Sequence, residues 1–243
     1  MIDSSLRARN WDQEYRQLTE SFGSPPLATL AVRQELARGA LLLDTRPAEQ
    51  FATGHLRGAL HVDLRGRFSA WAALLIRASE RLLLIAENVK RANEARQRLA
   101  RVGLTRVVGY SQFEGGKWLD AGMELARMPL MYCKDVGSLL KGPSMQLIDA
   151  RSRAEWRKGH LPGAIAMPLL ELASTTPDII PVQRRFVYCQ QGFRATTAAS
   201  ILLRRGVAGV GVLFDGVEGW MALGWPLTVP TTASCDLGPS VTP

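Results

Sequence analysis

The chain has 243 residues and a mass of 26.7 kDa, which allows one large domain or two domains of ordinary size. A hydrophobic fraction of 47% beside 21% charged residues is typical of globular proteins and excludes the disordered and fibrous classes. The formal net charge of +8 comes from Lys and Arg spread along the chain. We therefore expect small anions as partners and no nucleic acid, which would favour a basic tail or interleaved aromatic and basic residues.

The apolar runs are short, and none approaches the roughly 18 residues of a membrane helix, so we expect no membrane partner. Residues 1–17 lack an apolar core after their charges, so we expect no secretory signal and a cytoplasmic location. Three cysteines, Cys133, Cys189 and Cys235, are too few and too scattered for a disulfide framework or a metal site. We expect neither a metal nor an organic cofactor, and the sequence leaves the oligomeric state open.

In chain order, apolar runs alternate with helical patterns. A helix is predicted from Thr29 to a cap at Gly39. The elements predicted after it are a strand over 40–44, a short apolar segment at 61–64 followed by a helix, a strand over 81–86, a helix over 92–103 and a strand over 106–110. The same order returns at 146–150, 164–167, 184–189, 195–206 and 209–214. Short continuous apolar strands alternating with helices predict the α/β class, with a parallel sheet flanked by helices.

The second half of the chain repeats the first. Residues 41–62 align with 146–167, including a Gly-His pair in each, and Arg91-Ala92 aligns with Arg194-Ala195. The repeating unit of about 100 residues has the size of a domain. We expect domains at 1–125 and 130–228, with a flexible, Pro- and Thr-rich tail at 229–243.

A cysteine separates a strand from a helix in residues 186–200, FVYCQQGFRATTAAS. Cys189 falls at the carboxyl end of the predicted strand, where open parallel sheets place ligand sites. The N–H groups before the helix can form an anion cradle that stabilises a thiolate nucleophile, and Gly192 permits the tight curl. Arg194 adds a planar cation suited to oxyanions. The alternative is a buried structural cysteine with a surface arginine.

The loop CQQGFRA, preceded by DARSRAEWRKGHLPGA and followed by FDGVEGWMALGWPL, resembles the rhodanese (sulfurtransferase) family. The resemblance implies two tandem rhodanese-like domains. It implies that Cys189 takes a sulfane sulfur from a small anionic donor such as thiosulfate, carries it as a persulfide and passes it to cyanide or a thiol. The implied persulfide-binding loop is Gln190, Gln191, Gly192, Phe193 and Arg194. Asp149 and Arg151 are implied as supporting residues beside this loop.

Loop length separates two chemistries of this family's fold. Cys189 to Arg194 spans six residues, as in sulfur-carrying rhodaneses, whereas the related phosphatases have one residue more. Phosphatase or arsenate chemistry is therefore the enzymatic alternative, and a non-catalytic module that binds an anion or a partner is the other. Gln190 and Gln191 stand where the two-domain thiosulfate enzymes usually have basic residues, so thiosulfate is only the default donor.

The first copy lacks the nucleophile. Alignment through Arg91 puts Ala86 at the position of Cys189, with Glu87 beside it and Val89 in place of Gly192. Alanine cannot attack a donor, Glu87 repels anions, and valine resists a left-handed backbone. We therefore expect the first domain to be inactive, with Ala86 as the inactive counterpart of Cys189.

Overall fold

The computed structural model describes residues 26–136, 145–174 and 184–230. The chain divides between Arg127 and Met128 into two compact units, here called unit 1 and unit 2. Cys235 and the tail from residue 231 onward lie outside the described residues.

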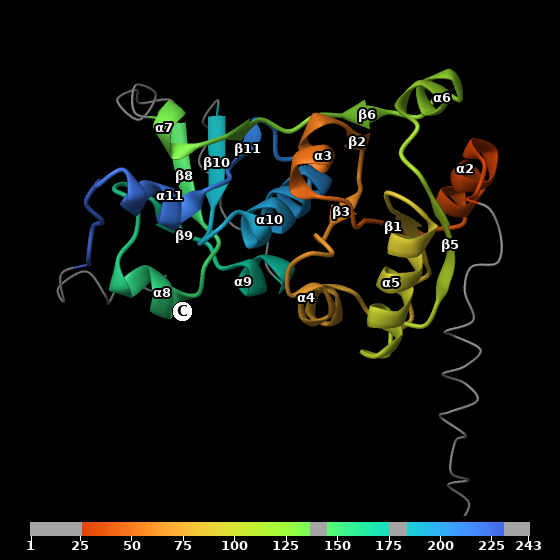
Figure 1. Cartoon of the computed structure of the whole chain (residues 1–243), viewed down its shortest axis with the longest axis horizontal. Helices are drawn as coiled ribbons and strands as arrows, with labels where there is room; N and C mark the ends of the chain where they lie inside the picture. The colour runs from red at the N-terminus through yellow and green to blue at the C-terminus, as the bar shows by residue number, and fades with distance from the viewer. Residues whose placement is uncertain (1–25, 137–144, 175–183, 231–243) are drawn as a thin grey trace, which may run out of the picture. The chain divides into compact units, whose positions relative to one another are not determined.

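Unit 1 contains a four-stranded parallel sheet in the order β3-β1-β4-β5 (Figure 1). Its strands are β1 (Leu41–Asp44), β3 (Leu60–His61), β4 (Leu82–Ile85) and β5 (Val107–Ser111). A separate antiparallel pair joins β2 (His55–Leu56) to β6 (Leu125–Ala126). All four residues of β4 are buried, as expected for a central strand that is covered on both faces.

The helices of unit 1 follow the strands. They are α2 (Thr29–Ala37), α3 (Ala48–Thr53), α4 (Phe68–Leu75), α5 (Val89–Ala100) and α6 (Gly115–Asp120). Helix α2 packs against β4 and β5, and α4 packs against α5. Helix α5 is strongly amphipathic: Ala92, Ala95 and Leu99 are buried on one face, while its charged residues occupy the other.

Unit 2 contains a five-stranded parallel sheet in the order β7-β11-β10-β8-β9 (Figure 1). The strands are β7 (Leu130–Met131), β8 (Met145–Asp149), β9 (Ile165–Ala166), β10 (Arg184–Tyr188) and β11 (Val210–Leu213). The central strand β10 pairs with β8 on one side and β11 on the other. Its carboxyl end therefore lies at the middle of the sheet edge.

The helices of unit 2 are α7 (Cys133–Val136), α8 (Arg153–Lys158), α9 (Leu169–Ser174), α10 (Phe193–Arg204) and α11 (Gly216–Ala222). Helix α10 packs against β10, β11 and α9, and every residue from Ala195 to Leu202 is buried. Small side chains such as Ala195, Ala198 and Ala199 let this helix lie close to the sheet. Trp220 of α11 is buried in the core cluster with Tyr188 and Leu213.

The predicted fold class is confirmed: each unit is a parallel sheet flanked by helices. Two helices begin at residues that differ from those predicted. Helix α10 begins at Phe193, because Gly192 takes the left-handed conformation at the N-cap. Helix α5 begins at Val89, because the Asn88 side chain caps it by accepting from the Arg91 N–H.

Candidate active site

Cys189 directly follows β10 at the carboxyl edge of the unit 2 sheet. Tyr188, the last residue of β10, is in register with Asp149 of β8 and Leu213 of β11. The next residue on each strand therefore enters a loop at the same edge. The structure places Cys189 where parallel sheets carry their ligand sites.

The Cys189 thiol lies inside a tight backbone loop. The Gly192 N–H points at Sγ, with 3.1 Å between nitrogen and sulfur. Gly192 has φ +87°, and a Cβ added there would stand 2.5 Å from the backbone oxygen and ring of Phe214. Only glycine satisfies both conditions. Cys189 itself is 2% exposed, so the loop covers the sulfur closely.

The first turn of α11 holds the loop from outside. The Val217 N–H donates to the Cys189 carbonyl at 3.0 Å, and the Glu218 N–H donates to the Gln190 carbonyl at 3.3 Å. A Cβ on Gly216 would collide with the Cys189 carbonyl oxygen. The backbone around the sulfur is thus fixed by contacts from both sides, as a preorganised anion cradle requires.

Arg194, the cation of the loop, is bound by a carboxylate. Its Nη1 and Nη2 donate to the Glu155 oxygens at 2.7 and 2.8 Å, in the bidentate geometry that arginine and carboxylate favour. This hydrogen bonding lowers the pKa of Glu155 to about 2, and it raises the pKa of Arg194. Negative charge on Cys189 also contributes to raising the pKa of Arg194, so the cation and the sulfur interact.

The two glutamines of the loop share one carboxylate. Gln190 Nε2 donates to Glu218 Oε1 at 3.3 Å, and Gln191 Nε2 donates to Glu218 Oε2 at 2.9 Å. Glu218 belongs to α11, whose N–H groups already hold the loop backbone. An acidic side chain is therefore fixed beside the loop that carries the thiol.

Asp149 and Arg151 form a buried pair beneath this edge. Arg151 Nε and Nη2 donate to the Asp149 carboxylate at 3.0 and 2.7 Å, and Nη2 also donates to the Gly159 carbonyl at 2.7 Å. Both residues are at most 4% exposed. The pair ties β8 to the loop after α8 and touches no part of the thiol in these contacts. In unit 1, Asp44 and Arg46 make the same arrangement with the Gly54 carbonyl.

The corresponding loop of unit 1 has a different shape. Ala86 follows β4 as Cys189 follows β10, but the N-cap of α5 is Asn88, with an extended φ of −163°. Positive φ occurs only at glycines in the residues that the structure describes, so Val89 does not form a left-handed cap as Gly192 does. The unit 1 loop therefore enters its helix through an extended residue that caps with its side chain, where the unit 2 loop uses a left-handed glycine.

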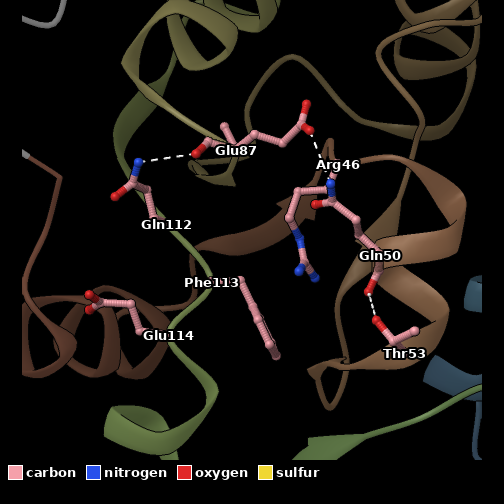
Figure 2. Close-up of a pocket in the computed structure, with 8 residues that line it drawn as sticks. Arg46, Gln50, Thr53, Glu87, Gln112, Phe113 and Glu114 are labelled. Carbon is pink, nitrogen blue, oxygen red and sulfur yellow. Dashed lines mark hydrogen bonds between the residues drawn. The ribbon is translucent and has the colours of Figure 1, made fainter.

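A pocket of about 620 Å³ opens at this position in unit 1 (Figure 2). Its lining residues are Arg46, Gln50, Thr53, Ala86, Glu87, Gln112, Phe113 and Glu114. Figure 2 shows the Glu87 side chain directed towards Gln50, whose Nε2 donates to it at 3.1 Å. The Arg46 guanidinium lies 4.2 Å from the centre of the Phe113 ring. This pocket contains no nucleophilic thiol and presents a carboxylate where unit 2 has Gln190.

Cys133 and the histidines of the two Gly-His pairs make local contacts outside residues 189–194. Burial raises the pKa of the Cys133 thiol, which donates to the Gly216 carbonyl at 3.3 Å. His160 stacks on Trp156 with 4.0 Å between ring centres and bonds its carbonyl, and His55 does the same with Phe51 in unit 1. Within the three described stretches, no group of three or more His, Cys, Asp or Glu is placed to hold a metal ion. None of the helices found there is both long and apolar enough to cross a bilayer.

The rhodanese-like domain model matches the chain twice, over residues 29–116 and 133–223. The chain belongs to the rhodanese-like domain family. The two matches fall in unit 1 and unit 2, so the tandem arrangement expected from the internal repeat is confirmed. Both rhodanese-like units carry the fold, and unit 2 carries the cysteine.

Similar proteins support a family of sulfurtransferase type. A protein of Allochromatium vinosum named sulfurtransferase is 29% identical over 84 residues, which are 35% of this chain and 78% of that protein. A putative sulfur carrier protein of Bacillus subtilis is 26% identical over 77 residues, 32% of this chain and 42% of that protein. Each of these matches covers about a third of the chain, the length of one rhodanese-like unit.

Among solved structures, a thiosulfate sulfurtransferase from Pseudomonas aeruginosa is 22% identical, with a TM-score of 0.39. That match covers 86% of this chain, and this chain spans 44% of the Pseudomonas protein. A human single-domain sulfurtransferase is 24% identical over 39% of this chain and 96% of its own, with a TM-score of 0.35.

Two residues at the site were not found from the sequence, namely Glu155 and Glu218. Glu155 had a visible signal, since Ser152 and Glu155 form the S-x-x-E capping box at the start of α8. That motif predicts a helix start but not a contact with Arg194. Glu218 had no signal, because its contacts with Gln190 and Gln191 depend on how α11 packs beside the loop.

Proposed function

We propose that the chain is a sulfurtransferase in which Cys189 accepts a sulfane sulfur and carries it as a persulfide. The donor is a small sulfane-sulfur compound, with thiosulfate as the reference case, and the acceptor is cyanide or a thiol. The catalytic domain in this proposal is residues 130–228, and residues 1–125 form a non-catalytic copy.

One observation carries the proposal above the others. The Gly192 N–H lies 3.1 Å from Cys189 Sγ in a loop that only glycine can close. The N–H groups of residues 190–194 precede and begin the 12-residue helix α10, whose positive end favours a thiolate and a persulfide anion. The close cover over Cys189 suits one added sulfur atom better than a tetrahedral phosphate.

The proposed reaction has two balanced steps. The Cys189 thiolate attacks the outer sulfur of thiosulfate, a new S–S bond forms, and sulfite leaves with the electrons of the broken bond. Cyanide or an acceptor thiolate then attacks the outer sulfur of the persulfide and restores the Cys189 thiolate. The loop N–H groups stabilise negative charge on sulfur in both steps.

This chemistry needs a free thiol between turnovers. A reducing compartment keeps such a thiol available, which supports the cytoplasmic location expected from the sequence. Unit 1 does not take part in the transfer in this proposal, because Ala86 has no nucleophile.

The test is thiocyanate formation from thiosulfate, or from a low-molecular-weight persulfide, in the presence of cyanide. Wild-type protein and Cys133→Ser, which removes the buried thiol outside the loop, are expected to be active, and Cys189→Ser inactive. Equal turnover by wild type and Cys189→Ser would overturn the proposal. An aryl phosphate is assayed in parallel, because Cys189-dependent hydrolysis of it would support phosphatase chemistry instead. Anion binding without turnover of any donor would support a non-catalytic module.

A further inference from the structure

A carboxylate of α11 is bound by the side chains of the Cys189 loop. The Glu218 carboxylate accepts from both Gln190 and Gln191, at 3.3 and 2.9 Å. Two backbone N–H groups of α11 bind loop carbonyls, those of Cys189 and Gln190, and so fix the helix beside the loop. The carboxylate is exposed to solvent but is bound to the loop by these two side-chain hydrogen bonds.

The positive charge of the loop is already compensated. Arg194 gives both terminal nitrogens to Glu155, so its guanidinium fork is occupied by a protein carboxylate. Glu155 is ionised at neutral pH, and its hydrogen bonds with Arg194 lower its pKa further, to about 2. The nearby Arg151 is likewise paired with Asp149. Within residues 26–136, 145–174 and 184–230, Glu218 forms no ion pair, so its charge is left beside the loop once these pairs cancel.

The geometry points to Glu218 as a specificity-determining residue that selects the sulfur donor by charge. It disfavours dianions such as thiosulfate and favours low-molecular-weight persulfides, above all those with a cationic tail. This inference rests on the proposed function, because it concerns the donor that loads Cys189. The physical basis is Coulomb repulsion between a fixed carboxylate and an anionic donor, and attraction between the carboxylate and an ammonium group.

The loading step with a persulfide needs no further reagent. The Cys189 thiolate attacks the outer sulfur of R–S–SH, and a new S–S bond forms between them. The S–S bond of the donor breaks, and the thiolate R–S⁻ leaves with the bonding electrons. The proton stays on the transferred sulfur, so atoms and charge balance.

The test compares three donors at neutral pH and low salt: thiosulfate, the persulfide of cysteamine and the persulfide of mercaptopropionate. The two persulfides are similar in length and carry opposite charges on their tails. Loading of Cys189 is followed in single turnover by acid quenching and peptide mass spectrometry. Each rate is divided by the rate at which the same donor loads a small free thiol, which removes differences in intrinsic reactivity.

Wild type is expected to load fastest from the cysteamine persulfide and slowest from thiosulfate. The ratio of the normalised loading rates with the cysteamine and mercaptopropionate persulfides is expected to fall about tenfold in Glu218→Gln. This is the size expected when one partly solvated charge is removed. High salt should narrow the wild-type ratio in the same direction, because it screens exposed charges.

The control is Glu171→Gln, which removes a carboxylate of unit 2 that pairs with Arg153 on the exposed surface. It should leave the donor ratio unchanged. A Glu218→Gln ratio equal to that of wild type, or a wild-type preference for thiosulfate, would overturn the inference while leaving persulfide chemistry at Cys189 intact. Failure of every donor to load wild type would instead overturn the proposed function, and this inference with it.

Discussion

Replacing Gly192 with alanine should damage unit 2 more than the same change at another left-handed glycine. Gly192 has φ +87°, and an added Cβ would stand 2.5 Å from the backbone oxygen of Phe214. The left-handed backbone alone costs a residue with a side chain roughly 1–2 kcal/mol. Overpacking against a backbone atom, which cannot rotate away, adds roughly 1–3 kcal/mol. The expected loss in the free energy of unfolding is therefore roughly 2–5 kcal/mol.

Gly206 provides the matched control. It follows the other end of α10 with φ +80°, and an added Cβ would meet nothing within 4 Å. Gly206→Ala should therefore cost only the backbone share, roughly 1–2 kcal/mol. Both variants place the same side chain at a left-handed position beside the same helix, so their difference isolates the contact with Phe214.

The assay is hydrogen exchange of peptides that cover β10 and α10, measured by mass spectrometry across a urea series. It reports the opening free energy of unit 2 without requiring the whole chain to unfold in one step. The same samples are incubated with a sulfur donor, and Gly192→Ala should lose loading of Cys189 while Gly206→Ala keeps it. Equal losses of stability in the two variants would refute the steric reasoning at the loop.

Three further predictions concern charge and the inactive copy. The folded-state pKa of Glu155 is about 2 and lies below its unfolded value. Its ion pair should therefore stabilise unit 2 above about pH 4, and this contribution should disappear as pH falls towards 2. In thermal denaturation, Glu155→Gln should lower the free energy of unfolding by up to about 1 kcal/mol at pH 7 and not at all near pH 2. Arg151→Leu should lower the opening free energy of β8, measured by hydrogen exchange, by roughly 3–5 kcal/mol, because it leaves the Asp149 carboxylate buried without its partner. A loss below about 1 kcal/mol would contradict a supporting role for Arg151. Ala86→Cys, made in a Cys189→Ser background, should acquire no sulfur from any donor, because its loop lacks a left-handed glycine. Peptide mass spectrometry that finds sulfur at position 86 would contradict the claim that the shape of this loop, and not only the missing thiol, prevents sulfur transfer in unit 1.

The sheets could be predicted because burial leaves a direct mark on the sequence. Four-residue apolar runs such as 82–85 have no polar face to alternate with, and the structure buries every residue of that run. Helix starts were less predictable. Gly192 and Asn88 occupy equivalent ends of the two loops, yet one caps through a left-handed backbone and the other through its side chain. This choice depends on what surrounds each loop, such as Phe214 against Gly192.

The candidate site likewise contains residues that could be predicted from the sequence and residues that could not. Cys189, Gly192 and Arg194 lie within one short loop, so their proximity follows from chain order alone. Glu155 and Glu218 reach the loop from α8 and α11, and their approach is decided by tertiary packing. From the sequence alone, Arg194 was predicted to bind an oxyanion, whereas in the structure it pairs with Glu155. The charge balance of the site therefore emerges only from the folded unit.

The central claim is that sulfur is carried on Cys189, and the most direct measurement is the mass of the peptide that bears it after incubation with a sulfane-sulfur donor. The account predicts one extra sulfur atom on this peptide, none on the peptide that bears Cys133, and loss of the added sulfur when cyanide is supplied. A Cys189 peptide that remains unmodified with thiosulfate and with both persulfides would contradict the account.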